Sequence, residues 1–145
     1  MTSKKLTRIL EWKGMVKEQM AIEMRRAREI LRAETRKLDA LNAKLAENIE
    51  AMDGIQSDPN PDANRLELLS SYIIYLDKSI KDQEKRVSEA HKEVEAKQGE
   101  LRKAYSEERV FETLRNRMAG EEMREMRCLE QKESDFNTVT RRPGK

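Results

Sequence analysis

The fold is decided by residues 66–104, which read LELLSSYIIYLDKSIKDQEKRVSEAHKEVEAKQGELRKA. Apolar side chains recur in this stretch at alternating steps of three and four residues. The apolar positions are Leu66, Leu69, Ile73, Leu76, Ile80, Val87, Ala90, Val94, Leu101 and Ala104, interrupted only by Gln83 and Lys97. A repeat of about 3.5 residues keeps one stripe of a helix facing one partner helix. The stretch therefore predicts a coiled-coil seam.

The composition of the whole chain is typical of long helices. Of the 145 residues, 40% are charged, 37% are hydrophobic and 4% are aromatic, with only five Gly and three Pro. Such a composition is unusual for a compact globule, and the regular seam distinguishes the chain from disordered segments. We expect an all-α, elongated protein without an enclosed cavity, so its function is expected to lie in what it contacts.

One segment, residues 53–62, interrupts the helical pattern with the sequence DGIQSDPNPD. Gly54 is able to take the left-handed conformation that closes a helix, and Pro59 cannot continue one. Asn60 and Pro61 suit an N-cap and a first helical turn. The predicted boundaries are a helix at 3–53, a loop at 54–60, a helix at 61–137 and a basic tail at 138–145, within one domain spanning residues 1–145.

The first predicted helix carries a seam of its own. Its positions are Met20, Met24, Ala27, Leu31, Leu38, Leu41, Leu45, Met52 and Ile55, with Glu34 and Asn48 as polar members. In one antiparallel register the facing pairs are Met20 with Lys97, Ala27 with Ala90, Glu34 with Gln83 and Leu41 with Leu76. The polar pair Glu34 and Gln83 would hydrogen-bond and fix this register. A parallel homodimer is the alternative, but a short loop favours antiparallel neighbours and hence a coiled-coil hairpin.

The two predicted helices differ in length, so the second overhangs the first. In the register above residue 6 lies beside residue 111, which leaves roughly the last 30 residues of the second helix without a partner. This end still carries apolar residues at helical spacing: Phe111, Leu114, Met118, Met126 and Leu129. An unpartnered apolar stripe is a candidate docking surface. Fraying of the end and pairing of two copies are the alternatives.

Four arginines, Arg25, Arg28, Arg32 and Arg36, follow one another at steps of three or four residues. We call them the basic ridge. Glu29 is spaced to pair with Arg25 or Arg32, so the favoured interpretation is a solvated, salt-bridged face. An acidic protein partner is the sharper alternative. Nucleic acid is third, because aromatic residues are absent nearby and the net charge is only +2.

No pattern in the sequence indicates catalysis. There is no glycine-rich phosphate loop, and the single Cys128 and single His91 form no metal-binding spacing. We expect no enzyme activity, no cofactor and no metal. The longest apolar run, residues 72–76, is far shorter than a bilayer requires, and no secretion signal is recognisable. A cytoplasmic protein without membrane insertion is expected.

The end of the chain carries the most specific pattern, Glu130-Gln131-Lys132-Glu133-Ser134-Asp135-Phe136, followed by the basic run Arg141-Arg142-Pro143-Gly144-Lys145. Two further patterned stretches are Leu6-x-x-Ile9-Leu10-x-x-Lys13 and Asn64-Arg65 with Tyr72-Ile73-x-x-Leu76-x-x-x-Ile80. Together these stretches resemble the flagellar export protein FliJ family. Residues 137–140 depart from the Ala- and Arg-rich end usual in the family, which leaves the end of the second helix open.

The resemblance implies an antiparallel coiled coil similar to the central stalk of rotary ATPases. It implies a non-catalytic protein that binds a hexameric export ATPase, contacts the export-gate membrane protein FlhA and assists export chaperones. The implied ATPase-binding residues are Phe111, Leu114, Met118, Met126, Leu129, Gln131 and Phe136. The implied gate-binding residues are Leu45, Ile49, Tyr72 and Leu76, of which Leu45 and Leu76 also serve the seam.

The resemblance further implies a cytoplasmic protein that associates peripherally with the inner membrane at the flagellar base. Two alternatives stay open on the sequence. The chain could be the stalk protein of a virulence injectisome, which shares the architecture and differs in its partners. It could also be a self-associating structural coiled coil without an ATPase partner.

Overall fold

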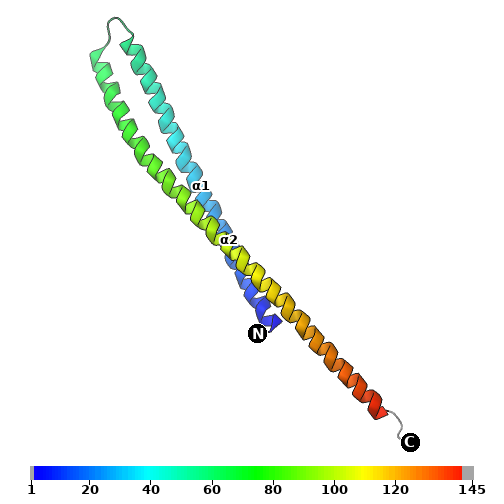
Figure 1. Cartoon of the computed structure of the whole chain (residues 1–145). Helices are drawn as coiled ribbons and strands as arrows, with labels where there is room; N and C mark the ends of the chain where they lie inside the picture. The colour runs from blue at the N-terminus through cyan, green and yellow to red at the C-terminus, as the bar shows by residue number, and fades with distance from the viewer. Residues whose placement is uncertain (1, 142–145) are drawn as a thin grey trace. The chain divides into compact units, whose positions relative to one another are not determined.

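The computed structural model describes residues 2–141, with the side chain of residue 141 excepted. It contains two helices, α1 (Ser3–Gln56) and α2 (Ala63–Arg141), which run antiparallel, and the described residues include no strand (Figure 1). The all-α prediction of two long packed helices, the second overhanging the first, is confirmed. Contacts divide the chain into two compact units. The hairpin unit is Met20–Glu100, and the terminal unit is Met1–Gln19 with Leu101–Lys145.

The first helix ends later than expected, because α1 continues through Gly54 to Gln56. The prediction of a left-handed Gly54 is wrong, since no described glycine has a positive φ. A glycine within a helix costs only about 1 kcal/mol relative to alanine, which the flanking turns tolerate. The last turn is closed by Ser57, whose amide and hydroxyl both donate to the carbonyl of Asp53, at 3.0 and 2.8 Å.

The second helix begins at Ala63 and is capped by Asp62. The Asp62 carboxylate accepts hydrogen bonds from the amides of Asn64 and Arg65, at 3.1 and 3.3 Å. The prediction of an N-cap at Asn60 is therefore wrong. Asn60 instead donates its amide to Asp58 at 3.1 Å, in a local turn within the connection. A carboxylate cap is also favoured by the positive end of the helix dipole.

The hairpin unit buries one stripe of each helix, and the stripe is the predicted seam. Every predicted seam position of both helices is buried or half-buried. The most enclosed apolar members of this unit are Met24, Ala27, Leu76, Ile80 and Ala90, with Leu76 only 1% exposed. Because two helices form a single layer pair, this stripe supplies the hydrophobic core of the unit.

A polar pair sits within that core. Gln83 is 5% exposed, and its amide nitrogen donates to the Glu34 backbone carbonyl at 2.9 Å and also to the Glu34 carboxylate. The predicted pairing of these two residues is confirmed. Such a pair is satisfied in one register only, so it selects this alignment over slips of the apolar pattern.

Lys97, the other polar member of the α2 seam, was predicted to face the apolar Met20, but its ammonium group lies beside carboxylates. Its ammonium lies 3.2 Å from the Glu23 carboxylate, with Glu100 and Glu93 at 3.7 and 3.9 Å. The hydrogen bond to Glu23 raises the pKa of Lys97, and the nearby carboxylates add to this. The charge is thus neutralised at the edge of the seam.

We expect the double substitution Glu34→Leu with Gln83→Leu to keep or raise the melting temperature while it loosens the register. Replacing both partners of a buried polar pair with apolar groups is often neutral or stabilising, whereas register depends on the pair. Thermal unfolding and solution mass measure both effects. The variant should give more than one species, and the single substitution Lys85→Ala, on an exposed face, should not. A less stable variant with one unchanged solution mass would contradict this role.

Candidate functional site

The terminal unit joins the start of α1 to the middle of α2 through polar contacts. Ser3 donates its amide to the Glu122 carboxylate at 2.9 Å, and its hydroxyl donates to the second oxygen of the same group. The amide of Ser3 belongs to the first turn of α1, where backbone donors lack partners within the helix. Glu122 therefore caps α1 from the neighbouring helix. These hydrogen bonds from Ser3 lower the pKa of Glu122.

Contacts in the terminal unit depart from the predicted register. The prediction placed Ser3 beside Leu114 and Lys13 beside Ala104, whereas Ser3 bonds Glu122 and Lys13 pairs with Glu107. These contacts thus lie three to eight residues further along α2 than predicted. A heptad pattern indicates which face of a helix is covered, but not which polar side chains meet beside it.

Two lysines of α1 lie against acidic and aromatic residues of α2. The Lys13 ammonium is 3.1 Å from Glu107 and 4.8 Å from the ring centre of Phe111. The Lys17 ammonium lies 3.0 Å from both oxygens of Glu108 and 4.8 Å from the ring centre of Tyr105. Each lysine is thus shared between a carboxylate and an aromatic ring, which stabilises the helix pair.

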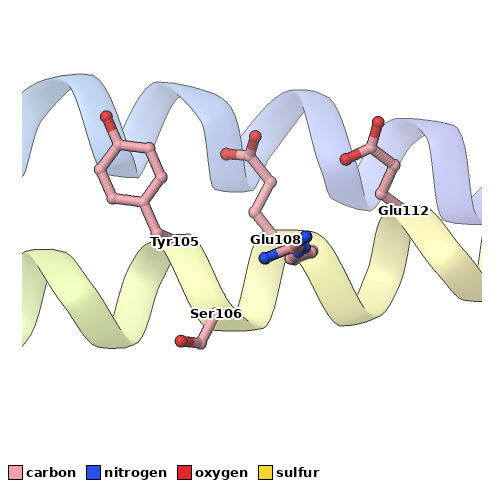
Figure 2. Close-up of a pocket in the computed structure, with 5 residues that line it drawn as sticks. Tyr105, Ser106, Glu108 and Glu112 are labelled. Atoms are coloured by element: carbon pink, nitrogen blue, oxygen red, sulfur yellow. The ribbon is translucent and has the colours of Figure 1, made fainter.

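The geometry around Glu108 is visible in Figure 2, where Tyr105, Glu108 and Glu112 point toward α1 and Ser106 points away from it. Lys17 hydrogen-bonds one oxygen of Glu108, and the other oxygen is buried with only the electrostatic contact. The hydrogen bond to Glu108 raises the pKa of Lys17. A hollow of about 310 Å³ adjoins these residues. Of its lining residues, Glu108 is engaged in the ion pair with Lys17. No group of metal-ligating side chains occurs among the described residues.

Beyond Glu122 the described residues of α2 form no hydrogen bond or ion pair with α1. We call residues 123–141 the overhang, and every side chain from 123 to 140 is exposed. Its large apolar members are Met123, Met126, Leu129, Phe136 and Val139, each 59–68% exposed. Met126, Leu129 and Phe136 share one helix face, because they are separated by three and seven residues.

The overhang is shorter than predicted, and its start lies further along the chain. Phe111 and Met118 are half-buried within the helix pair, and Leu114 is 39% exposed. Gln131 is exposed and donates to Asp135 at 3.2 Å along its own helix. Of the predicted ATPase-binding residues, the structure places four on the overhang: Met126, Leu129, Gln131 and Phe136.

The helix continues through residues 137–140, where the sequence left its end open. The hydroxyls of Thr138 and Thr140 donate to the carbonyls of Ser134 and Phe136, at 2.8 and 3.0 Å. Threonine is compatible with a helix when its hydroxyl bonds the preceding turn in this way. The predicted tail at 138–145 is therefore helical up to residue 141, and its remaining residues lie outside the described part of the chain.

The predicted gate-binding residues separate into two groups. Leu76 is buried and Leu45 is half-buried, so both serve the core. Tyr72 and Ile49 are 39% and 44% exposed. Sequence analysis missed Leu68 and Tyr75, which are 72% and 63% exposed.

Leu68, Tyr72 and Tyr75 lie at steps of four and three residues on one face of α2, and we call them the tyrosine stripe. The rings of Tyr72 and Tyr75 stack with their centres 6.2 Å apart. The signal that could have revealed this stripe was a large aromatic residue beside the seam rather than in it. Exposed aromatic residues are enriched at protein interfaces.

The four arginines of the basic ridge are all exposed. The prediction of a solvated face is confirmed, but the predicted salt bridges are wrong. Within residues 2–140 none of the four forms an ion pair with a carboxylate, and Glu29 pairs with neither neighbour. Arg36 instead donates to the Arg32 carbonyl at 3.4 Å. Exposed ion pairs gain little free energy, so extended arginines remain hydrated.

Comparison with known proteins identifies one family. A family model described as flagellar FliJ protein matches residues 2–138. No curated protein and no solved structure gives a significant match. In the part of the chain that is described, neither helix has a stretch long and apolar enough to cross a membrane.

We expect Glu122→Gln to lower the melting temperature by a few degrees at neutral pH. The folded-state pKa of Glu122 lies below its unfolded value of about 4.3, so its stabilising effect is present above that pH. The effect is lost as the pH falls through the folded-state pKa. Melting curves across the acid range should therefore show the variant and the wild type converging. Glu121→Gln, at the exposed neighbouring position, should show no such convergence, and equal behaviour of the two variants would refute the cap.

Proposed function

Because this chain belongs to the flagellar FliJ protein family, we propose that it is a non-catalytic coupling protein of the flagellar export apparatus. The family makes it a flagellar, export-related protein. The proposed partners are the hexameric export ATPase, the gate protein FlhA and export chaperones. We place its action in the cytoplasm, with peripheral attachment at the inner membrane and without binding to nucleic acid.

The observation that carries the proposal is the exposed apolar face of the overhang. Met126, Leu129 and Phe136 are each at least 60% exposed, on the part of α2 that follows Glu122, its partner for Ser3 of α1. Apolar faces of this kind mark surfaces that become buried on binding. Methionine is unbranched and adapts to irregular surfaces, which suits contact with successive, slightly different ATPase subunits. The overhang is accordingly the proposed ATPase-binding end.

The tyrosine stripe and Ile49 form the proposed gate-binding surface. Leu68, Tyr72 and Tyr75 lie in the first turns of α2, which begins at Ala63. This surface is therefore at the turn end of the hairpin unit (Figure 1). Stacked tyrosines present a rigid apolar surface with hydroxyl groups at its edge. Such a surface buries area on binding at little cost in side-chain entropy.

Coupling by a non-catalytic chain requires unequal affinity for the states of the ATPase ring. A ligand shifts a conformational equilibrium only by the difference in its binding free energies for the two states. In the proposed mechanism the overhang binds one nucleotide state of the ring more tightly than the others. The bound chain thereby promotes ring assembly or turnover, while its gate-binding surface contacts FlhA.

Replacing Met126, Leu129 and Phe136 together with serine should abolish stimulation of the cognate export ATPase. The variant removes the apolar face and should weaken binding at least about tenfold, since central anchors dominate interface energies. ATPase turnover and ring mass, measured with and without the full chain, report the effect. Helix pairing should be unchanged, because these side chains are exposed and lie outside the seam.

The matched control changes Arg124, Arg127 and Thr138 together to serine, at exposed positions on the opposite side of the overhang. This control should still stimulate the ATPase. The proposed ATPase-binding face would be refuted if the variant of Met126, Leu129 and Phe136 stimulated turnover as fully as the wild type.

A second variant separates the two proposed surfaces. Tyr72→Ala with Tyr75→Ala should reduce capture of the soluble domain of FlhA by about tenfold, because aromatic anchors carry much of an interface. Stimulation of the ATPase should persist, since the tyrosine stripe and the overhang belong to different units. Pull-down and turnover assays on the same preparations measure both. Loss of both activities, or of neither, would argue against a separate gate-binding surface.

A further inference from the structure

The basic ridge is a linear array of cations on the outward face of α1. Arg25, Arg28, Arg32 and Arg36 follow at steps of three, four and four residues, so they lie on one side of the helix. The seam residues Met24, Ala27 and Leu31 lie on the side that faces α2. From first to last arginine the ridge spans about 16 Å along the helix.

The charge of the ridge is not neutralised within the described chain. From Arg25 to Lys37 there are six basic residues and two acidic ones. Of the two acids, Glu34 is engaged by Gln83 and Lys37, while Glu29 is exposed and forms no ion pair in the described structure. Three lysines that reach the neighbouring helix, Lys13, Lys17 and Lys97, are by contrast all paired with carboxylates.

The surroundings of the ridge select among anionic partners. A membrane-lying helix needs an apolar face to insert beside its cations, and the apolar face of α1 is packed against α2. Single-stranded nucleic acid is held by aromatic stacking, and residues 21–44 contain no aromatic side chain. A helix with carboxylates three or four residues apart presents anions about 5–6 Å apart in a line, which matches the spacing of the arginines. Arginine also binds carboxylates through two parallel hydrogen bonds.

We propose that the basic ridge binds an acidic helical segment of another protein, with carboxylates spaced three or four residues apart. This site is separate from the overhang and from the tyrosine stripe. It does not depend on the proposed ATPase and gate contacts, so its failure would leave that function untouched.

The test uses the full chain and an alanine-rich helical peptide with glutamates at the ridge spacing. A peptide of the same composition, with its glutamates distributed around the helix, reports general attraction. Oligothymidylate and vesicles of phosphatidylcholine with phosphatidylglycerol represent the other anionic partners. Binding is measured by fluorescence anisotropy, or by sedimentation for the vesicles, at low and physiological salt.

The ridge variant changes Arg25, Arg28, Arg32 and Arg36 to glutamine, which keeps helix propensity. A control variant changes Lys78, Lys85, Arg86 and Lys92 to glutamine, with the same loss of charge on exposed positions of α2. Asp82 lies between Lys78 and Lys85 at steps of four and three residues, and Glu89 lies three residues before Lys92, so these control cations stand beside carboxylates. Circular dichroism establishes that both variants remain helical.

The proposal predicts that the aligned peptide binds the wild type and the control variant equally. The ridge variant should bind it at least about tenfold more weakly, because several arginine–carboxylate pairs are lost at once. Equal binding by the ridge and control variants would overturn the proposal. So would equal affinity for the aligned and distributed peptides, or ridge-dependent binding of oligothymidylate or vesicles that is tighter than that of the aligned peptide.

Discussion

A pair of helices has only one place to bury apolar surface, the stripe along which the helices touch. The side chains that are most enclosed among residues 2–140 all belong to this stripe, and one of them, Gln83, is polar. The rest of the structure depends on it, because neither long helix would be stable in water without burying its apolar face. The high proportion of charged residues follows directly, since most positions of both helices remain in contact with solvent.

The sequence allowed this stripe to be predicted residue by residue, because a heptad repeat determines which side of a helix is covered. The Glu34 and Gln83 pair was also predictable, since polar members of a seam must find each other. The alignment of the two helices in the terminal unit was not predictable in this way. Its polar partners, Ser3 and Glu122, lie outside the predicted seam, and no periodicity indicates that they meet. The helix ends were predicted wrongly for a related reason. Asp62 and Ser57 cap the helices through specific hydrogen bonds, and several nearby residues were equally suited to capping.

The candidate surfaces were predictable to different degrees. Apolar residues on the overhang stood out from the sequence, but Phe111 and Met118 turned out to be half-buried once the terminal unit was aligned. Leu68 and Tyr75 were missed because they lie beside the seam, and heptad spacing identifies only the residues within it. The basic ridge was visible as a pattern, whereas the absence of ion pairs along it required side-chain positions. The functional surfaces of a helix pair are thus formed by the residues that lie outside the seam.

The contact between Ser3 and Glu122 has a mechanical consequence. It marks the point at which the pairing of α1 with α2 ends, and it therefore sets the length of the overhang. If α1 shifted along α2 by one heptad, the overhang would become about 10 Å longer or shorter, and apolar groups would still cover one another. A serine and a carboxylate thus fix the length of the overhang, although they contribute little apolar surface to the core.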